Sequence, residues 1–548
     1  MNPVIYFHPE AYTTSGPKLM GRNAAGESFL RGFFTHSRAE TFSAQVSQAQ
    51  HALQFSEIAK RFRPAIPIRI FNRETLGDLE EVVYYPGPGI GEHAFHRALI
   101  SHTQYSLCGI THTTSSAAAM DAIVGLLTAP VYPWDAVICT STAVKDNVQR
   151  LLQAQVDFLR DRLKLQQVVL PKFPVIPLGI HCADFEHREA DRVTSRSELG
   201  IAPDEIVVLF MGRLSFHAKA HPLAMYQALQ KASQNSRKRV VLIECGWHAN
   251  NHIQSAYTEA ARVACPSVPI KILDGRLADQ RALAWAAADI FCSLSDNIQE
   301  TFGITPIEAM AAGLPVVVSD WDGYRDTVRD RIDGFRIPTA MPVAGLATDL
   351  AFRHALEIDT YDMYCGHTCS LVSVDIQKTV EAFTQLFQSD SLRAEMGASA
   401  KARAKENFDW SVIVPRYEAL WTELNQIRST KAGYDKRLAH PWPARMDPFE
   451  SFSGYPTQQL TADTKVRLGR ESAALAGEML SELRSLSMVN FARFVFPTQA
   501  EATQVLNMLE AGEKTCGELL QPISQARRPY IFRSLAWLLK LGVIQISK

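Results

Sequence analysis

The sequence lacks any strong imbalance of charge and any long apolar run. Its 56 basic and 57 acidic side chains leave a formal net charge of −1, so the whole chain has no attraction for nucleic acid or for acidic membranes. No apolar stretch approaches the roughly 20 residues that a membrane-spanning helix needs. The first residues lack a basic segment followed by an apolar one, so we expect no signal peptide. We therefore expect a cytoplasmic location, either in solution or peripherally at a membrane surface.

The chain also lacks a disulfide pattern and an internal repeat. Its 9 cysteines are an odd number, and several, such as Cys139 and Cys292, lie inside apolar runs. This distribution is typical of reduced, buried thiols. We find no fixed sequence period of solenoid type. With 548 residues, 47% of them hydrophobic and 21% charged, the chain is an ordinary soluble protein that is too long for one core and has about three domains.

Two series of alternating β-rich runs and helical patterns occupy most of the chain. The first series predicts strands at 4–7, 68–71, 82–85, 107–111, 136–140 and 175–178, with helices at 24–34 and 142–163. The second predicts strands at 206–211, 240–245, 270–273, 290–294 and 315–319, with helices at 223–232, 254–263, 279–288 and 306–312. Such alternation predicts two α/β domains, each a parallel sheet covered by helices on both faces.

The remainder of the chain reads as helices, a linker and a small module. Helical patterns run from 343 to about 427, and a segment rich in proline and glycine at 429–475 reads as a linker. The tail has a short helix, a turn and a second helix before a strand, which resembles a winged-helix module. Its Arg527, Arg528 and Arg533 suit phosphates, but no run of base-reading side chains is present. We expect it to bind a partner or a second copy of the chain, and not nucleic acid.

The most informative segment is 300–313, E-T-F-G-I-T-P-I-E-A-M-A-A-G. Glu300 and Glu308 stand around the start of a helix, and an apolar strand follows. This order places both acids at the carboxyl edge of a parallel sheet, where open α/β folds bind ligands. Ionised carboxylates only accept hydrogen bonds, so they suit hydroxyl-rich ligands. The alternative is that Thr305 caps the helix and Glu308 closes a capping box.

The E-x7-E spacing followed by A-M-A-A-G-L-P-V-V resembles the retaining nucleotide-sugar glycosyltransferases of family 4, the glycosyl transferases of group 1. The resemblance covers most of residues 1–428 and implies the GT-B fold, in which two Rossmann-like domains face each other across a cleft. The boundaries that follow are 1–190 for the acceptor domain, 191–410 for the donor domain, 411–428 for a helix that crosses back, 429–475 for the linker and 476–548 for the C-terminal module. In this family the residue at Glu300 contacts sugar hydroxyls, and that at Glu308 holds the ribose.

Cations for a donor diphosphate follow the first strand of the second series. Gly212, Arg213 and Lys219 match the family's G-R-L and its subsequent lysine, whose two cations bind the donor phosphates. Arginine offers a planar fork and lysine a point charge, so the pair can follow charge onto a leaving oxygen. The spacing from Arg213 to Lys219 is one residue longer than usual in the family, which leaves His217 as a nearby substitute. The alternative is that both cations are solvated surface charges.

The resemblance also implies further contacts with the donor. Gly21, just before the first helix, is the candidate for a phosphate-binding loop, although a loop that merely turns is the alternative. His112 after the strand at 107–111 would reach the sugar, although a core histidine with its hydrogen bonds satisfied is the alternative. The backbone of Gly303 and Ile304 would orient the sugar. Asp274 would bound the nucleoside.

No metal or other cofactor is expected. Asp320 and Asp322 have D-x-D spacing but follow a strand where the family has a turn, so we interpret them as a loop. The spacing of Cys365, His367 and Cys369 is not that of a common zinc site.

The sequence therefore predicts retaining transfer of a sugar from a nucleotide-diphosphate sugar to a hydroxyl acceptor, by an enzyme of the hexosyltransferase type. The sugar, the nucleotide, the acceptor and the oligomeric state stay open. Alternatives are a GT-B nucleotide-sugar epimerase, or a glycosyltransferase-like scaffold whose C-terminal module binds a partner. A phosphorylase would need a pyridoxal lysine signature, which is not evident.

Overall fold

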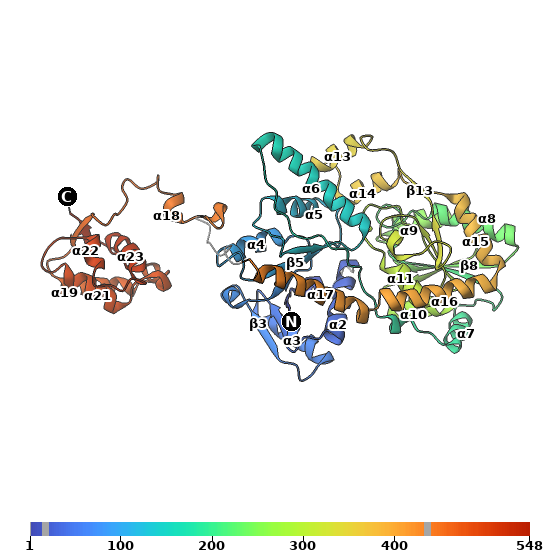
Figure 1. The fold of residues 1–548 in the computed structure, drawn as a ribbon, viewed down its shortest axis with the longest axis horizontal. Helices are drawn as coiled ribbons and strands as arrows, with labels where there is room; N and C mark the ends of the chain where they lie inside the picture. Colours follow the sequence, from blue (N-terminus) through green and yellow to red (C-terminus); the bar gives the residue numbers. More distant parts are fainter. Residues whose placement is uncertain (1, 14–20, 432–439, 548) are drawn as a thin grey trace. The chain divides into compact units, whose positions relative to one another are not determined.

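The computed structural model describes residues 2–13, 21–431 and 440–547. These residues form two compact units, Met1–Trp442 and Pro443–Lys548. The first unit holds two separate six-stranded sheets (Figure 1), which define its first and second lobes. No described helix has both the length and the apolar composition that crossing a bilayer requires.

The first lobe has a parallel sheet of order β3-β2-β1-β4-β5-β6. Its strands are β1 (Val4–Tyr6), β2 (Phe42–Gln45), β3 (Ile68–Phe71), β4 (Val82–Tyr84), β5 (Ser106–Ile110) and β6 (Ala136–Ile138). Its helices are α1 (Pro9–Tyr12), α2 (Gly21–His36), α3 (Ala49–Phe62), α4 (Ile90–Ala98), α5 (Ala117–Val124) and α6 (Thr142–Leu163). This is the strand order of a Rossmann domain, with the reversal between β1 and β4.

The second lobe repeats the same topology, with the order β12-β11-β10-β7-β8-β9 and all strands parallel. Its strands are β7 (Ile206–Met211), β8 (Val240–Gly246), β9 (Ile270–Asp274), β10 (Ile290–Ser293), β11 (Val316–Ser319) and β12 (Gly334–Ile337). Its helices are α7 (Glu189–Glu198), α8 (Leu223–Ser236), α9 (Asn251–Ala264), α10 (Ala278–Ala287), α11 (Ile304–Ala311), α12 (Tyr324–Thr327), α15 (Ile376–Gln388) and α16 (Asp390–Asn407). The reversal lies between β7 and β10. Two such lobes confirm the predicted GT-B fold.

Two strands differ from the sequence prediction in the first lobe. The strand expected at 175–178 is wrong, because Val175 makes only an isolated bridge to Cys139 and the chain then runs on without a ladder. β2 was not predicted, because polar residues interrupt its apolar pattern. Those polar side chains are nevertheless buried, and the Tyr85 hydroxyl donates to Gln45 Oε1 at 3.0 Å.

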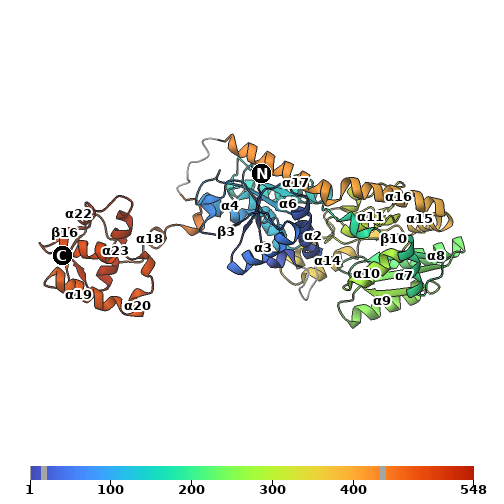
Figure 2. The same ribbon diagram turned by 90° about the horizontal axis from the view of Figure 1, so that it is seen from below.

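The helix α17 (Trp410–Ser429) packs on the first lobe although it follows the second in sequence. Figure 2 shows α16 over the second lobe and α17 over the first. Trp410 and Trp421 are buried, and a Cβ on Gly32 or Gly179 would meet the Trp410 ring at 2.4 or 2.5 Å. Burial of each such side chain contributes about 2–3 kcal/mol. A cavity of about 420 Å³ on the outer side of α17 includes none of the predicted site residues.

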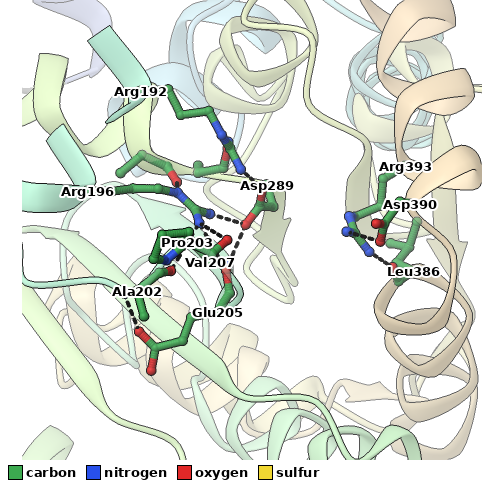
Figure 3. A network of polar contacts seen from close by, with 12 residues as sticks. Arg192, Arg196, Ala202, Pro203, Glu205, Val207, Asp289, Leu386, Asp390 and Arg393 are labelled. Carbon is green, nitrogen blue, oxygen red and sulfur yellow. Dashed lines mark hydrogen bonds and ion pairs between the residues drawn. The ribbon is translucent and has the colours of Figure 1, made fainter. Parts of the chain in front are cut away.

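A buried ionic network fastens the amino edge of the second sheet (Figure 3). Arg192 and Arg196 of α7 both form ion pairs with Asp289, which precedes β10. The Val207 N–H of β7 donates to the same carboxylate at 2.7 Å. Because this one carboxylate, next to β10, binds both α7 and β7, it holds α7 against the edge opposite the predicted site.

The C-terminal unit has a small antiparallel sheet of order β16-β15-β17 and several helices. Its elements are α18 (Pro448–Ser451), β15 (Lys465–Leu468), α19 (Ala473–Arg484), α20 (Ser487–Asn490), α21 (Gln499–Met508), β16 (Lys514–Thr515), α22 (Cys516–Leu520), α23 (Arg528–Lys540) and β17 (Ile544–Ile546). β15 lies within the segment expected as a linker, so the module's sheet begins before residue 476. The Arg527 guanidinium pairs with Glu501, and Arg528 donates to Ile523 O.

Candidate active site

The predicted cations and acids of the second lobe lie where its strand order reverses. β7 and β10 pair with each other, although β8 and β9 separate them in sequence. Arg213 follows β7, and the loop that carries Glu300 follows β10. The reversal point outside the carboxyl ends of the strands is where open α/β sheets bind ligands.

Glycines allow neighbouring strands to approach closely at this edge. A Cβ on Gly246 would lie 1.9 Å from the carbonyl oxygen of Gly212, far inside van der Waals contact. Gly212 itself has a φ of +151°, a conformation that side chains disfavour. Close packing therefore explains the glycine at 246, and the backbone conformation explains the glycine at 212. The predicted contact of Gly212 with a donor stays a prediction.

Lys219 and Glu300 form an ion pair between the loop after β7 and the loop after β10. Their side chains are 24% and 11% exposed, so the pair is largely shielded from water. Burial alone would raise the pKa of Glu300, but Lys219 and the N–H groups of Thr301 and Phe302 outweigh it and hold the pKa below its usual value. Glu300 is thus an ionised acceptor beside a cation.

Arg213 belongs to the same cluster. Its Nη2 donates to Ala218 O at 3.0 Å and to Gln299 Oε1 at 2.9 Å. Gln299 precedes Glu300, so Arg213 and Lys219 are both tied to one loop. The two cations and the acid predicted from sequence are therefore brought together at one edge.

The helix that carries Glu308 begins earlier than predicted. Gly303 is the N-cap of α11, with a φ of +81°, and no side chain caps the helix. Glu308 is therefore the fifth helical residue and cannot close a capping box, so that alternative is wrong. The uncapped first turn leaves N–H groups, including that of Ile304, for an anionic or polar ligand. Gly303 is also required sterically, because a Cβ there would lie 1.9 Å from Tyr324.

Arg281 of α10 is a site residue that the sequence analysis missed. Its Nη1 donates to Gly275 O at 2.9 Å, beyond the end of β9. Burial raises the pKa of Glu308 to about 7, against the attraction of Arg281 and then of Lys219. An arginine in the first turns of a helix after a strand was the only available signal, and it does not single out this residue.

The first lobe reaches the site through residues that follow β5 and β6. Thr301, next to Glu300, donates from Oγ1 to His112 O at 3.2 Å, and Thr140 Oγ1 donates to Thr301 O at 3.4 Å. The structure therefore places the backbone of His112 beside the Glu300 loop. The predicted contact of its imidazole with a sugar stays a prediction.

Acids of the second lobe also meet the N-terminus of α6. Ser141, the N-cap, donates from Oγ to Asp322 Oδ1 at 3.1 Å, and the Thr142 N–H donates to Asp326 Oδ2 at 2.6 Å. Negative charge is favourable at this end of a helix. Burial and then the charge of Glu300 raise the pKa of Asp322 to about 8, so this contact depends on protonation near neutral pH.

Two further predicted contacts belong to other elements. The carboxylate of Asp274, at the end of β9, is paired with Arg276, which lowers its pKa. Gly21 is the first residue of α2, while residues 14–20 of the predicted phosphate loop lie outside the described residues.

The candidate metal ligands point to separate partners. Asp320 pairs with Arg336 at 3.5 Å, whereas Asp322 accepts from Ser141. His367 Nδ1 lies 3.1 Å from Asp359, and Cys369 Sγ lies 3.3 Å from Gly366 O. Among the described residues, no three acids, histidines or cysteines gather in a way that would hold a metal.

Opposite pKa shifts predict opposite pH effects for the two glutamates. The pKa of Glu308 is about 7 instead of 4.5. Its burial therefore destabilises the folded protein increasingly as pH rises from about 4.5 to about 7. We expect Glu308→Gln to raise Tm above pH 7, by the equivalent of ~3 kcal/mol, and to leave it unchanged near pH 4. The pKa of Glu300 is lowered, so Glu300→Gln should reduce Tm at neutral pH. Melting curves across pH test both, and the same sign for both variants would contradict this electrostatic account.

Fold and site together define a two-domain Rossmann protein of the GT-B class. Residues 191–350 match the family described as Glycosyl transferases group 1. This segment contains Arg213, Lys219, Glu300 and Glu308.

Curated relatives align with parts of the chain. The D-inositol 3-phosphate glycosyltransferase of Nocardia farcinica is 26% identical over 190 residues, which are 34% of this chain and 41% of that protein. The phosphatidyl-myo-inositol mannosyltransferase of Mycobacterium leprae is 31% identical over 153 residues, 27% of this chain and 31% of the relative. The chain thus spans less than half the length of these relatives.

Similar solved structures cover more of the chain. Anabaena Alr3699/HepE, in complex with UDP and glucose, aligns with 77% of this chain and 100% of its own, at 15% identity and a TM-score of 0.47. A glycosyltransferase from Rickettsia africae aligns with 77% of this chain and 98% of its own, at 13% identity and a TM-score of 0.46.

Proposed function

We propose that this protein transfers a sugar, with retention of its anomeric configuration, from a nucleotide-diphosphate sugar to a hydroxyl group of an acceptor. The observation that carries the proposal is the cluster of Arg213, Lys219 and Glu300 at the reversal point between β7 and β10. Cations there suit a diphosphate, and the acid suits sugar hydroxyls. The match of residues 191–350 to Glycosyl transferases group 1 supports the same function.

The Lys219–Glu300 pair indicates how a donor would enter. The two groups satisfy each other in this structure. A donor diphosphate would compete for Lys219, and a sugar hydroxyl would donate to the released carboxylate of Glu300. Binding thus exchanges one ion pair for two charge-assisted contacts, which favours a ligand that carries both groups.

In the proposed reaction, the bond from the anomeric carbon to the diphosphate breaks and a bond to the acceptor oxygen forms on the same face. The acceptor proton passes to the leaving phosphate. Arg213 and Lys219 stabilise the charge that develops on that phosphate, which is the largest contribution that such a site makes. Glu300, His112 and the backbone at Gly303 and Ile304 orient the sugar, and Glu308 holds the ribose.

A thermal-shift comparison of UDP, GDP and ADP tests the donor site. We expect one of them to raise Tm, because a ligand at 100 times its Kd adds about 2.7 kcal/mol to the folded form. Arg213→Ala should abolish that shift. If none of the three changes Tm, the nucleotide-sugar proposal fails.

Product analysis separates the rival functions. A transferase cleaves the donor and releases the nucleoside diphosphate, slowly even with water as acceptor. An epimerase returns the intact donor with an inverted centre, and a scaffold leaves the donor unchanged. Chromatography of a donor incubated with the purified protein therefore distinguishes all three.

A further inference from the structure

An excursion of the second lobe, residues 339–374, leaves the sheet after β12 and returns before α15. It begins with β13 (Thr339–Ala340) and ends with β14 (Ser373–Val374), which pair antiparallel. Between them lie α13 (Thr348–Ala355) and α14 (Tyr361–Cys369), which Figure 1 shows on the side of the second lobe nearer to α6.

The inner end of the excursion is built into the candidate active site. The Tyr361 hydroxyl lies 2.9 Å from Ser115 Oγ of the first lobe. It also accepts from Gln299 Nε2 at 3.0 Å, and Gln299 Oε1 holds Arg213. One phenol thus joins the first lobe, the excursion and the predicted diphosphate-binding arginine.

The outer part of the excursion presents apolar side chains to solvent. No residue of α13 is buried. The exposed fractions are 55% for Met341, 75% for Val343, 70% for Leu346, 62% for Phe352 and 55% for Leu356. An isolated eight-residue helix is marginal in water, and several large apolar side chains exposed on one short segment indicate a binding site.

The charges of this segment are few, and one is already neutralised. Between 341 and 358 the residues of the acidic and basic types other than histidine are Asp349, Arg353 and Glu357. The Arg353 guanidinium forms a bidentate pair with Asp359. A protein interface needs a polar rim with matched donors and acceptors. An apolar chain needs none, so this strip favours a hydrocarbon over a protein.

We infer that the acceptor is an amphiphile, whose hydroxyl group enters between the lobes beside Tyr361 and whose acyl or prenyl chain lies along the 341–358 strip. The inference rests on the proposed function and adds the chemical class of its acceptor. The main support for this inference is that Arg213, Tyr361 and α13 follow one another in space. The head group and the hydrocarbon chain of one acceptor molecule would then occupy adjacent parts of the protein.

The first arm compares ethyl, octyl and dodecyl glycosides as acceptors, with the donor selected by thermal shift. We expect octyl to exceed ethyl glycosides in kcat/KM by about tenfold or more, given the gain per buried methylene. Phe352→Ser with Leu356→Ser should reduce this ratio about fivefold. The matched control is Leu53→Ser with Val263→Ser. These two residues are at least as exposed as Phe352 and Leu356 and lie on other helices, so the variant should leave the ratio unchanged.

The second arm measures sedimentation of the full chain with phosphatidylcholine vesicles and needs no active head group. We expect the α13 double variant to lose vesicle binding, whereas Phe491→Ser with Phe494→Ser, exposed apolar residues of the C-terminal unit, should retain most of it. Binding in this arm indicates an acceptor within a bilayer, and preference in the first arm alone indicates a free amphiphile.

Several results would overturn the inference. These are no preference in either arm, loss of binding only in the C-terminal variant, or an oligomer in solution that the α13 variant converts to monomer. Cleavage of the donor without acceptor is the separate measure of the proposed function. If the wild type cleaves the donor but shows no chain preference, only the inference fails; if it does not cleave the donor, the proposed function fails.

Discussion

Replacing Arg213 with alanine is expected to reduce kcat/KM for sugar transfer by about 100- to 1000-fold, while the fold stays intact. The guanidinium is the planar, permanently charged donor beside the predicted diphosphate, and removal of one such preorganised donor costs roughly this factor. Its structural hydrogen bonds are to Ala218 O and Gln299, whose loss costs only about 1–2 kcal/mol. Steady-state kinetics and a melting curve on the same preparation measure both effects.

The matched control is Arg239→Ala. Arg239 stands just before β8, at the opposite edge of the same sheet, where it pairs with Asp204 on an exposed surface. The Arg239→Ala variant should leave turnover unchanged. Arg213→Lys should recover part of the activity, because it keeps the charge and loses the fork. Near-normal turnover of Arg213→Ala would show that this cluster is not the active site.

The second large effect is expected at the Lys219–Glu300 pair. Lys219→Ala leaves a shielded carboxylate without its cation, which we expect to lower Tm by about 5 °C and to raise the pKa of Glu300. Glu300→Ala should abolish most transfer as well as lower Tm. Because the two groups compensate each other, the double variant should lose less Tm than the sum of the single changes.

Comparison with an exposed pair sharpens this experiment. Arg239→Ala, Asp204→Ala and their double variant form the same cycle on a solvated pair, which should change Tm by less than about 1–2 °C. Additive losses at Lys219 and Glu300 would show that the pair contributes no coupling. Coupling without loss of activity would show that it serves only stability.

Most strands of the second lobe could be predicted from the sequence, because fully buried parallel strands consist of continuous apolar runs. The run at 206–211 is such a strand and coincides with β7, and the polar residues that follow such runs lie at the sheet's carboxyl edge. Together with the resemblance to the glycosyltransferase family, this pattern allowed Arg213 and Glu300 to be named before the structure. β2 could not, because its buried Ser43 and Gln45 look like surface residues until their hydrogen-bonding partners are known.

Residues whose role depends on partners distant in the chain could not be predicted from the sequence. Arg281 is one of many exposed-looking arginines until α10 brings it towards Glu308. Asp322 reads as part of a turn until the first lobe presents Ser141 to it. The capping-box interpretation of Glu308 failed for a local reason: Gly303 begins α11 earlier than Thr305 would.

The amino-acid sequence by itself determined the alternation of strands and helices, the two α/β lobes and the loops in which charged side chains follow strand ends. These are properties of neighbouring residues, because periodic burial and glycine conformations act within a few positions. Tertiary structure alone decided the order of the strands, the ion pair between positions 81 residues apart and the Tyr361 link between the lobes. Such contacts depend on how whole sheets and helices pack, and no local pattern records which distant partner a side chain will meet.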